Sequence, residues 1–269
     1  MRALRIITDS LLLLLFAFSV SAQEQKPPNN AELANKLANP VANLISVPFQ
    51  SNVDYGIGPY NGARYTLNFQ PVIPTQLTPK LNLIARVVLP VIDQHDITGP
   101  GDDQFGLSDA TVSGFLSPAN PKNGLTWGAG PAFLVPVGTN EWLTTKKWAI
   151  GPTAIVLKQA NGFTYGCLMN QLWSFAGSKD RPGVNQMFLQ PFFAKNFPSG
   201  AGLSSNAEIT ANWKANTTVA FLNLGVSAVT KLGSQTVSLA IGPRIPITAP
   251  SGGKTDFGFR GSVTLVFPK

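Results

Sequence analysis

The sequence has little charge. Asp, Glu, Lys and Arg make up 12% of its 269 residues, about half the ~25% usual for a soluble globular domain. The formal net charge of +7 is spread along the chain without a basic run, so no nucleic-acid partner is expected. This low fraction of charged residues excludes an ordinary charged surface over most of the molecule.

Residues for covalent and metal chemistry are also scarce. Cys167 is the single cysteine, so no disulfide can form within the chain. The sequence has no phosphate-binding glycine loop with lysine, no H-E-x-x-H, no C-x-x-C and no G-x-S-x-G. We therefore expect no catalytic residues, no metal site and no cofactor, and we do not expect an enzyme.

Long hydrophobic runs occur only at the start. Residues 1–22 combine Arg2 and Arg5, an apolar core and a small-residue site ending at Ala22, which predicts a secretory signal peptide. No later segment approaches the ~18 consecutive apolar residues of a spanning helix. Because only helices and closed barrels satisfy every backbone group in lipid, a membrane protein of this sequence must be a barrel.

The last stretch, 256–267, alternates with the period of a strand. Its apolar face carries Phe257, Phe259, Val263, Leu265 and Phe267, and its other face Gly258, Arg260, Ser262 and Thr264. A strand of a soluble sandwich alternates in the same way. The alternation of 256–267 also fits the closing strand of an outer-membrane β-barrel. If this stretch is the closing strand, we expect it to contact the outer-membrane assembly machinery.

Turn signals divide the rest of the chain into an all-β, antiparallel pattern. The predicted strands are 46–55, 64–73, 81–92, 107–116, 125–137, 148–158, 163–175, 186–197, 203–214, 218–230, 236–248 and 256–267. Strands 163–175 and 186–197 are apolar on both faces, so their orientation is not readable. Connections after even strands are mostly short and those after odd strands mostly longer, as in transmembrane β-barrels of about twelve strands.

These features predict three parts. A signal peptide (1–22) precedes a periplasmic segment (23–45) and a barrel (46–269) in the bacterial outer membrane. In the second part, Ala31–Ile45 fits a short amphipathic helix, broken or kinked at Pro40. This segment would form a periplasmic cap, a small plug or a flexible leader.

Aromatic residues gather at strand ends. Next to the longer loops lie Trp148, Trp173 and Trp213, and at the opposite ends Trp127, Phe163, Tyr165, Phe197 and Phe267. Two aromatic girdles are expected where a barrel meets the two lipid–water interfaces. We therefore expect contact with outer-membrane lipid and lipopolysaccharide. Prolines inside the strands, several after glycine, predict bulges or bends.

Charged residues on the polar strand faces suggest a lumen site. Arg86, Arg244 and Arg260 fall on those faces, and an arginine on the lipid face at mid-depth would cost ~2–4 kcal/mol. The hypothesis is a basic patch in the lumen, paired with Glu208 and favouring anionic solutes. A salt-bridge network that only fills a narrow barrel is the alternative.

One enzymatic alternative centres on His95. A lipid-modifying barrel would need a serine within hydrogen-bond reach of it, for instance Ser108 or Ser113. A solvated loop histidine is the other interpretation. Nearby acidic residues, Asp93, Asp96, Asp102 and Asp103, could hold Ca²⁺, although their spacing fits no defined motif.

Several spaced motifs carry a family resemblance. They are LANPVANLISVPFQ, FGLSDATVSGFLSPA, WGAGP, KWAIGP, LWSFAG, VNQMFLQPF and the closing LVFPK. They resemble bacterial outer-membrane proteins that automated naming calls "neuromedin U" or "transporter", similar to the family associated with meta-pathway phenol degradation. The resemblance covers 37–269 and implies a twelve-stranded barrel that passes small hydrophobic compounds. It supplies no site residues, and a structural or adhesive barrel stays an alternative.

Overall fold

The computed structural model describes residues 29–250 and 252–267, which form one helix and fourteen strands of a single antiparallel sheet. The helix is α2 (Asn30–Leu37). The strands are β1 (Ile45–Ile57), β2 (Gly62–Phe69), β3 (Val72–Thr78), β4 (Leu81–His95), β5 (Asp103–Leu107), β6 (Ala110–Pro118), β7 (Leu125–Val135), β8 (Lys147–Ala160), β9 (Phe163–Gly177), β10 (Asn185–Asn196), β11 (Ala201–Asn212), β12 (Thr217–Leu232), β13 (Gln235–Thr248) and β14 (Phe257–Phe267).

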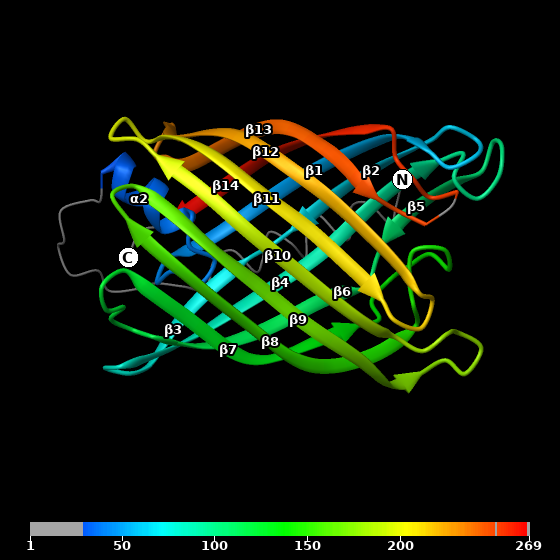
Figure 1. The fold of residues 1–269 in the computed structure, drawn as a ribbon, viewed down its shortest axis with the longest axis horizontal. Coiled ribbons are helices and arrows are strands. Elements are labelled where there is room, and N and C mark those ends of the chain that lie inside the picture. Colours follow the sequence, from blue (N-terminus) through cyan, green and yellow to red (C-terminus); the bar gives the residue numbers. More distant parts are fainter. Residues whose placement is uncertain (1–28, 251, 268–269) are drawn as a thin grey trace.

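The sheet closes into a barrel because its last strand pairs with its first (Figure 1). β14 runs antiparallel to β1 from Ile45↔Phe267 to Tyr55↔Phe257. β2 and β3 share one position in the wall, since both pair with β4, and β5 and β6 share another for the same reason. The described residues therefore form a closed twelve-strand barrel, which confirms the predicted fold class.

Connections of different length lie at opposite ends of the barrel (Figure 1). One of the two-residue connections joins β8 to β9 through Asn161 and Gly162. Both residues have positive φ (52° and 76°), which is the backbone that a two-residue hairpin turn needs. Longer loops, such as 96–102, 136–146 and 178–184, lie at the other end. The alternation of loop length predicted from the sequence is confirmed.

The barrel is apolar outside and mixed inside. Phe257 and Phe259 of β14 are 51% and 52% exposed, whereas Thr264 and Val266 on the opposite face are buried. β9, whose orientation the sequence left open, turns Met169 outward. Exposed apolar side chains cover the outer face along the strands, which is the surface that lipid requires.

The in-strand prolines rarely cause the bulges that were expected. Across Gly151-Pro152 the pairing of β8 with β9 continues without a register shift. A Cβ on Gly151 would collide with the carbonyl oxygen of Gln171, so the glycine admits a close backbone approach rather than an extra residue. Among the described pairings, a register shift lies beside an in-strand proline only at Pro246, and the predicted strand 64–73 is interrupted at Gln70-Pro71. The bulges expected at the other in-strand prolines are absent from these pairings, and the expected bends stay a prediction.

The N-terminal segment (29–44) lies inside one end of the barrel (Figure 1). The Asn29 side chain caps α2 by accepting a 2.8 Å hydrogen bond from the Glu32 amide. The helix ends at Leu37, well short of the predicted Ile45, because Pro40 cannot continue it. Among the described residues, no helix is both long and apolar enough to span a membrane.

Packing favours a plug over the other two interpretations of this segment. Leu33 and Leu44 are buried against Val229 and Val266 of the barrel. The Gln159 amide donates a 2.8 Å hydrogen bond to the Asn35 carbonyl. Apolar and polar contacts together hold the segment in the lumen, where it narrows that end of the barrel.

Candidate lumen site

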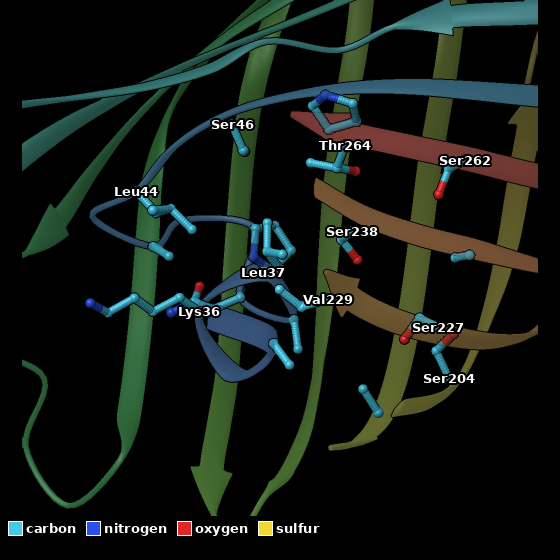
Figure 2. A pocket seen from close by; sticks show the side chains of 18 of the residues that line it. Lys36, Leu37, Leu44, Ser46, Ser204, Ser227, Val229, Ser238, Ser262 and Thr264 are labelled. Atoms are coloured by element: carbon cyan, nitrogen blue, oxygen red, sulfur yellow. The ribbon is translucent and has the colours of Figure 1, made fainter. Parts of the chain in front are cut away.

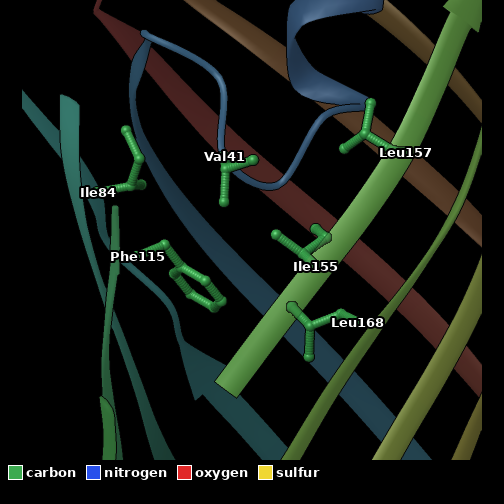
Figure 3. Close-up of a cluster of buried hydrophobic side chains, with 6 residues drawn as sticks. All are labelled: Val41, Ile84, Phe115, Ile155, Leu157 and Leu168. Carbon is green, nitrogen blue, oxygen red and sulfur yellow. The ribbon is translucent and has the colours of Figure 1, made fainter. Parts of the chain in front are cut away.

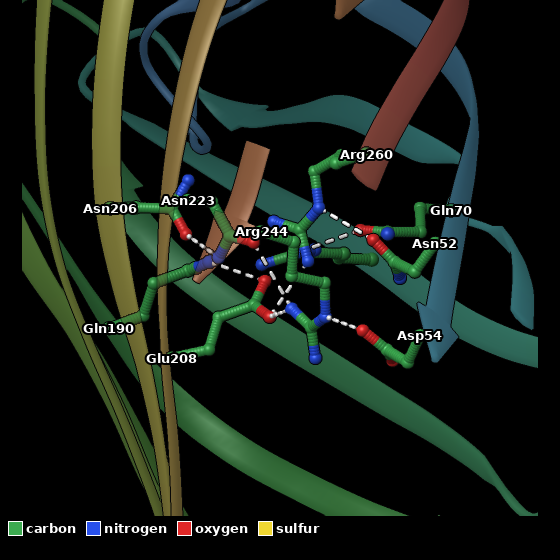
Figure 4. Close-up of polar contacts among 10 residues, drawn as sticks. Asn52, Asp54, Gln70, Gln190, Asn206, Glu208, Asn223, Arg244 and Arg260 are labelled. Carbon is green, nitrogen blue, oxygen red and sulfur yellow. Dashed lines mark hydrogen bonds and ion pairs between the residues drawn. The ribbon is translucent and has the colours of Figure 1, made fainter. Parts of the chain in front are cut away.

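Charged side chains from strands far apart in the sequence meet inside the lumen (Figure 4). Glu208 of β11 accepts 2.8 Å hydrogen bonds from both Arg244 of β13 and Arg260 of β14. Arg244 also donates to Asp54 of β1 at 3.1 Å, and Arg260 donates to Asn52 at 2.7 Å. The network therefore links the first strand to β11, β13 and β14.

The side chains in this network are largely removed from solvent. Side-chain exposure is 10% for Arg244, 12% for Arg260, 18% for Glu208 and 9% for Asp54. The Arg244 guanidinium also stacks on the Phe221 ring, with its central carbon 3.6 Å from the ring centroid. Buried charges persist only when they are paired and hydrogen-bonded, so each member depends on the others.

One inward-facing glycine, Gly258, makes room for the network. Gly258 lies between Arg244 and Asp54, since it pairs with Asp54 on one side and Arg244 on the other. A Cβ at this position would approach the Asp54 Oδ1 to 2.5 Å.

Two further arginines face the lumen and donate hydrogen bonds to the amide side chains of glutamines. The Arg86 Nη2 donates to Gln70 at 2.9 Å, and the Arg64 Nε donates to Gln94 at 2.8 Å. Neither forms an ion pair within the described part of the chain. Glu208 therefore contacts two arginines of the predicted basic patch, Arg244 and Arg260, but not the third, Arg86. That the patch selects solutes stays a prediction.

We call six residues the charged belt: Arg64, Arg86, Arg244, Arg260, Asp54 and Glu208. Four cations against two carboxylates leave an excess of two positive charges. Sequence reasoning missed Asp54 and Arg64. Strand alternation with the correct register of β1 and β2 would have placed both on the inner face, as direct neighbours across the sheet.

The opposite wall of the lumen is apolar (Figure 3). Ile84 of β4, Phe115 of β6, Ile155 and Leu157 of β8 and Leu168 of β9 form a buried cluster, which we call the apolar wall. Val41 of the N-terminal segment points into it and is 4% exposed. The plug therefore rests on the apolar wall. The ion-paired members of the charged belt, on β1, β11, β13 and β14, lie across the lumen from it.

A cavity of about 290 Å³ remains between the plug and the wall opposite it (Figure 2). Its lining includes Leu37 and Leu44 of the N-terminal segment together with Gln70 and Arg86. Arg86 thus belongs to both the belt and the cavity, whereas Gln70 lines only the cavity. Small and polar side chains of β11 to β14 complete the lining.

At the long-loop end, a buried carboxylate fixes a loop over the barrel mouth. Asp109 accepts hydrogen bonds from the Thr144 hydroxyl at 2.5 Å, the Thr145 amide at 2.7 Å and the Thr145 hydroxyl at 2.6 Å. The loop 136–146 consequently folds back onto the barrel. On its outer side, a hydrogen bond from Lys146 lowers the pKa of the exposed Glu141.

All eight residues of the two expected girdles lie on the barrel exterior. They are partly exposed: Trp127 48%, Trp148 43%, Trp173 47%, Trp213 55%, Phe163 39%, Tyr165 51%, Phe197 39% and Phe267 37%. Their contact with membrane interfaces stays a prediction. Tyr55 stacks on Phe257 at 5.2 Å near the long-loop end, and it is a further candidate that the sequence did not single out.

His95 has carboxylate neighbours and no serine partner among the described residues. Its Nδ1 lies 2.6 Å from Asp103 and its Nε2 3.4 Å from Asp93. Ser108 donates to the Leu143 carbonyl at 2.6 Å instead, and Ser113 pairs with Arg86 on the strand ladder. Neither Ser108 nor Ser113 therefore forms, in the described part of the chain, the Ser–His pair that a lipid-modifying enzyme would need.

The acidic loop around His95 is stabilised by its own hydrogen bonds. Asp96 accepts from the Gly101 amide at 2.6 Å, and Asp102 accepts from the Thr98 hydroxyl at 2.9 Å. Within 29–250 and 252–267, no group of three or more His, Cys, Asp or Glu side chains is arranged to hold a metal ion. The loop geometry offers no support for the calcium alternative.

Comparisons with known proteins bear on the fold. A scan of family models and a search of curated proteins both found no match. Among solved structures, an outer-membrane channel of Pseudomonas putida F1 is similar, with a TM-score of 0.64 and 14% identity. The match covers 83% of this chain and 94% of that one. At this identity the likeness shows the fold, which is that of an outer-membrane barrel.

Two further solved structures match more weakly. The β domain of a Bordetella autotransporter matches with a TM-score of 0.46 and 10% identity, over 83% of this chain and 99% of that one. The CymD monoaromatic hydrocarbon channel matches with a TM-score of 0.44 and 9% identity, over 94% of each chain. The family resemblance carried by the sequence motifs stays a prediction.

Proposed function

We propose that this protein is a passive outer-membrane channel for small molecules, in which the lumen wall selects the solute. The proposal rests on one observation: the outer face of the barrel wall is apolar, whereas its inner face carries charged side chains. Exposed apolar side chains face outward, and a charged belt faces a lumen that also holds a cavity of about 290 Å³. Such a difference between the two faces suits a barrel with lipid outside and water inside.

The two lumen surfaces suggest which solutes would pass. The belt's excess of two positive charges would favour anions, because fixed charges in a narrow passage select by sign. The apolar wall would lower the cost of passing a hydrophobic body. Small organic solutes with either property are the proposed cargo, and the likeness to a solved outer-membrane channel supports the assignment.

The proposed channel is narrow. Twelve strands are near the size at which side chains can fill most of a barrel, and the plug occupies one end of this lumen. Passage would therefore fall steeply with solute size. Outer-membrane lipid, lipopolysaccharide and the assembly machinery acting on β14 are the proposed partners in this setting.

Osmotic swelling of proteoliposomes tests the proposal. The purified protein is reconstituted, its folded state is checked by heat-modifiable gel migration, and liposomes are diluted into isoosmotic glycine, arabinose or raffinose. We expect fast swelling in glycine, slower swelling in arabinose and none in raffinose. Swelling no faster than that of protein-free liposomes, with the protein folded and inserted, would overturn the channel.

A further inference from the structure

The cavity beside the plug is lined by hydroxyl groups without protein partners. They come from six residues: Ser46, Ser204, Ser227, Ser238, Ser262 and Thr264. None of these hydroxyls forms a hydrogen bond to another group in the described ranges, and none is a fully buried unsatisfied atom. Figure 2 shows Ser204, Ser227, Ser238 and Ser262 around one side of the space beside Leu37. These donors are available to a bound molecule.

Arg86 adds a guanidinium whose charge and hydrogen-bond donors are only partly satisfied by protein groups. A guanidinium has five N–H donors, and the one protein hydrogen bond described for the Arg86 side chain is to Gln70. Arg244 and Arg260, by contrast, are held by carboxylates. Arg86 therefore has both charge and donors left for an anion that enters the cavity.

The charge of the lining favours one negative charge on the ligand. The lining contains Arg86 and Lys36 but no Asp or Glu. Lys36 is already paired with Glu32 at 2.8 Å, which leaves one unpaired guanidinium. A carboxylate matches a single guanidinium in charge and in its two acceptor oxygens, whereas a phosphate dianion usually needs more cationic partners.

The remaining lining is apolar and comes from both sides of the cavity. Leu37, Pro40 and Leu44 belong to the N-terminal segment, and Val72 and Val229 belong to the barrel. These side chains suit a short hydrocarbon body. The volume of about 290 Å³ is just below the ~300–1,000 Å³ typical of small-molecule sites, so the ligand must be small.

We infer that this cavity binds small aliphatic monocarboxylates, with the carboxylate on Arg86 and the serine hydroxyls and the hydrocarbon chain against Leu37 and Leu44. The inference rests on the proposed function, because the cavity belongs to the lumen through which a solute would pass. It goes further by naming the ligand class and the residue that recognises it. The plug forms one side of the site, so bound ligand and plug contact each other.

Isothermal titration calorimetry on the full, detergent-solubilised protein tests this inference without requiring transport. The probes are hexanoate, its neutral isostere hexanamide, and inorganic phosphate. We expect hexanoate to bind about tenfold or more tightly than hexanamide, since only the carboxylate makes charge-assisted hydrogen bonds. Equal binding of the two, no binding of hexanoate, or tighter binding of phosphate would overturn the assignment.

The variant Arg86→Gln locates the site. It removes the charge, and we expect hexanoate binding to weaken about tenfold or more with hexanamide binding unchanged. Arg181→Gln, at an exposed outer-loop arginine, is the matched control and should bind hexanoate as the parent does. Unchanged hexanoate binding by folded Arg86→Gln would refute the site. If that variant does not fold, the preference of the parent for hexanoate over hexanamide still decides the ligand class.

The outcomes also separate this inference from the proposed function. Arg86-dependent hexanoate binding with no liposome swelling would retain the binding site and remove the channel. Swelling with no hexanoate binding would retain the channel and remove the carboxylate site.

Discussion

The two walls of the lumen differ in how they are stabilised. The charged belt near the β1–β14 seam holds Arg244 and Arg260 on Glu208, with Asp54 and Asn52 as further partners. The apolar wall on β4, β6, β8 and β9 instead buries aliphatic and aromatic side chains around Val41 of the plug. One barrel interior thus combines an ionic network with a hydrophobic core.

The difference follows from what each wall must do. The belt connects the first strand to strands more than 150 residues later, so its ion pairs favour one register of barrel closure. The apolar wall gives the plug a surface on which it can dock without a covalent constraint. Changes on the two walls should therefore have different consequences.

Glu208→Gln should have the largest effect on stability. It leaves Arg244 and Arg260 without their shared carboxylate, and breaking a buried ion pair costs about 3–5 kcal/mol. Guanidinium unfolding in lipid vesicles measures the change. Glu141→Gln, which removes an exposed ion pair with Lys146, should change stability by less than about 1 kcal/mol. An equal, small effect of both variants would show that the belt does not stabilise the barrel.

Phe115→Ala, in the apolar wall, should destabilise the protein somewhat less than Glu208→Gln does. Phe115 is 1% exposed, and truncating a buried phenylalanine costs about 3 kcal/mol or slightly more. Phe105→Ala, at a side chain that is 70% exposed, serves as control, with little change expected in the same unfolding assay. A loss for Phe115→Ala no greater than for Phe105→Ala would contradict a packed apolar wall.

Val41→Asp should release the plug and spare the barrel. A carboxylate placed against the apolar wall costs about 2 kcal/mol or more of docking free energy. Proteolysis within 29–44 should then accelerate and single-channel conductance should rise, with the heat-modifiable fold retained. Val137→Asp, at an exposed position of the outer loop, should alter neither quantity. Unchanged cleavage and conductance in Val41→Asp would mean that Val41 does not hold the plug.

His95→Ala should have the smallest effect, because His95 belongs to neither wall. Its contacts with Asp103 and Asp93 are exposed, and exposed pairs contribute about 0–1 kcal/mol. Stability and conductance should stay within error of the parent protein. Loss of a phospholipid-hydrolysing activity in this variant would instead support the enzymatic alternative.

The barrel itself was predictable from local patterns. Alternation and turn residues located all twelve wall positions, since each strand records in its own sequence which face meets lipid. The strand predicted over 64–73 is split at Gln70-Pro71, one of the proline positions at which a bulge or bend was expected. β9 was unreadable because Leu168 and Leu172 face an apolar part of the lumen, so that neither face of the strand is polar.

The lumen site was only partly predictable. Arg244, Arg260 and Glu208 stood out because each is a charge on a polar strand face. Asp54 joins them only through closure of the barrel, a contact between residues far apart in the sequence. The position of Arg86 on Gln70 and the docking of Val41 likewise depend on packing across the lumen, which no local pattern records.

Conductance of the purified protein in a planar bilayer under a potassium chloride gradient tests the central claim most directly. The charged belt and the open space beside it predict discrete current steps, with a reversal potential that indicates preference for chloride over potassium. A folded, inserted protein that produces no steps, or one whose reversal potential indicates cation preference, would contradict the account.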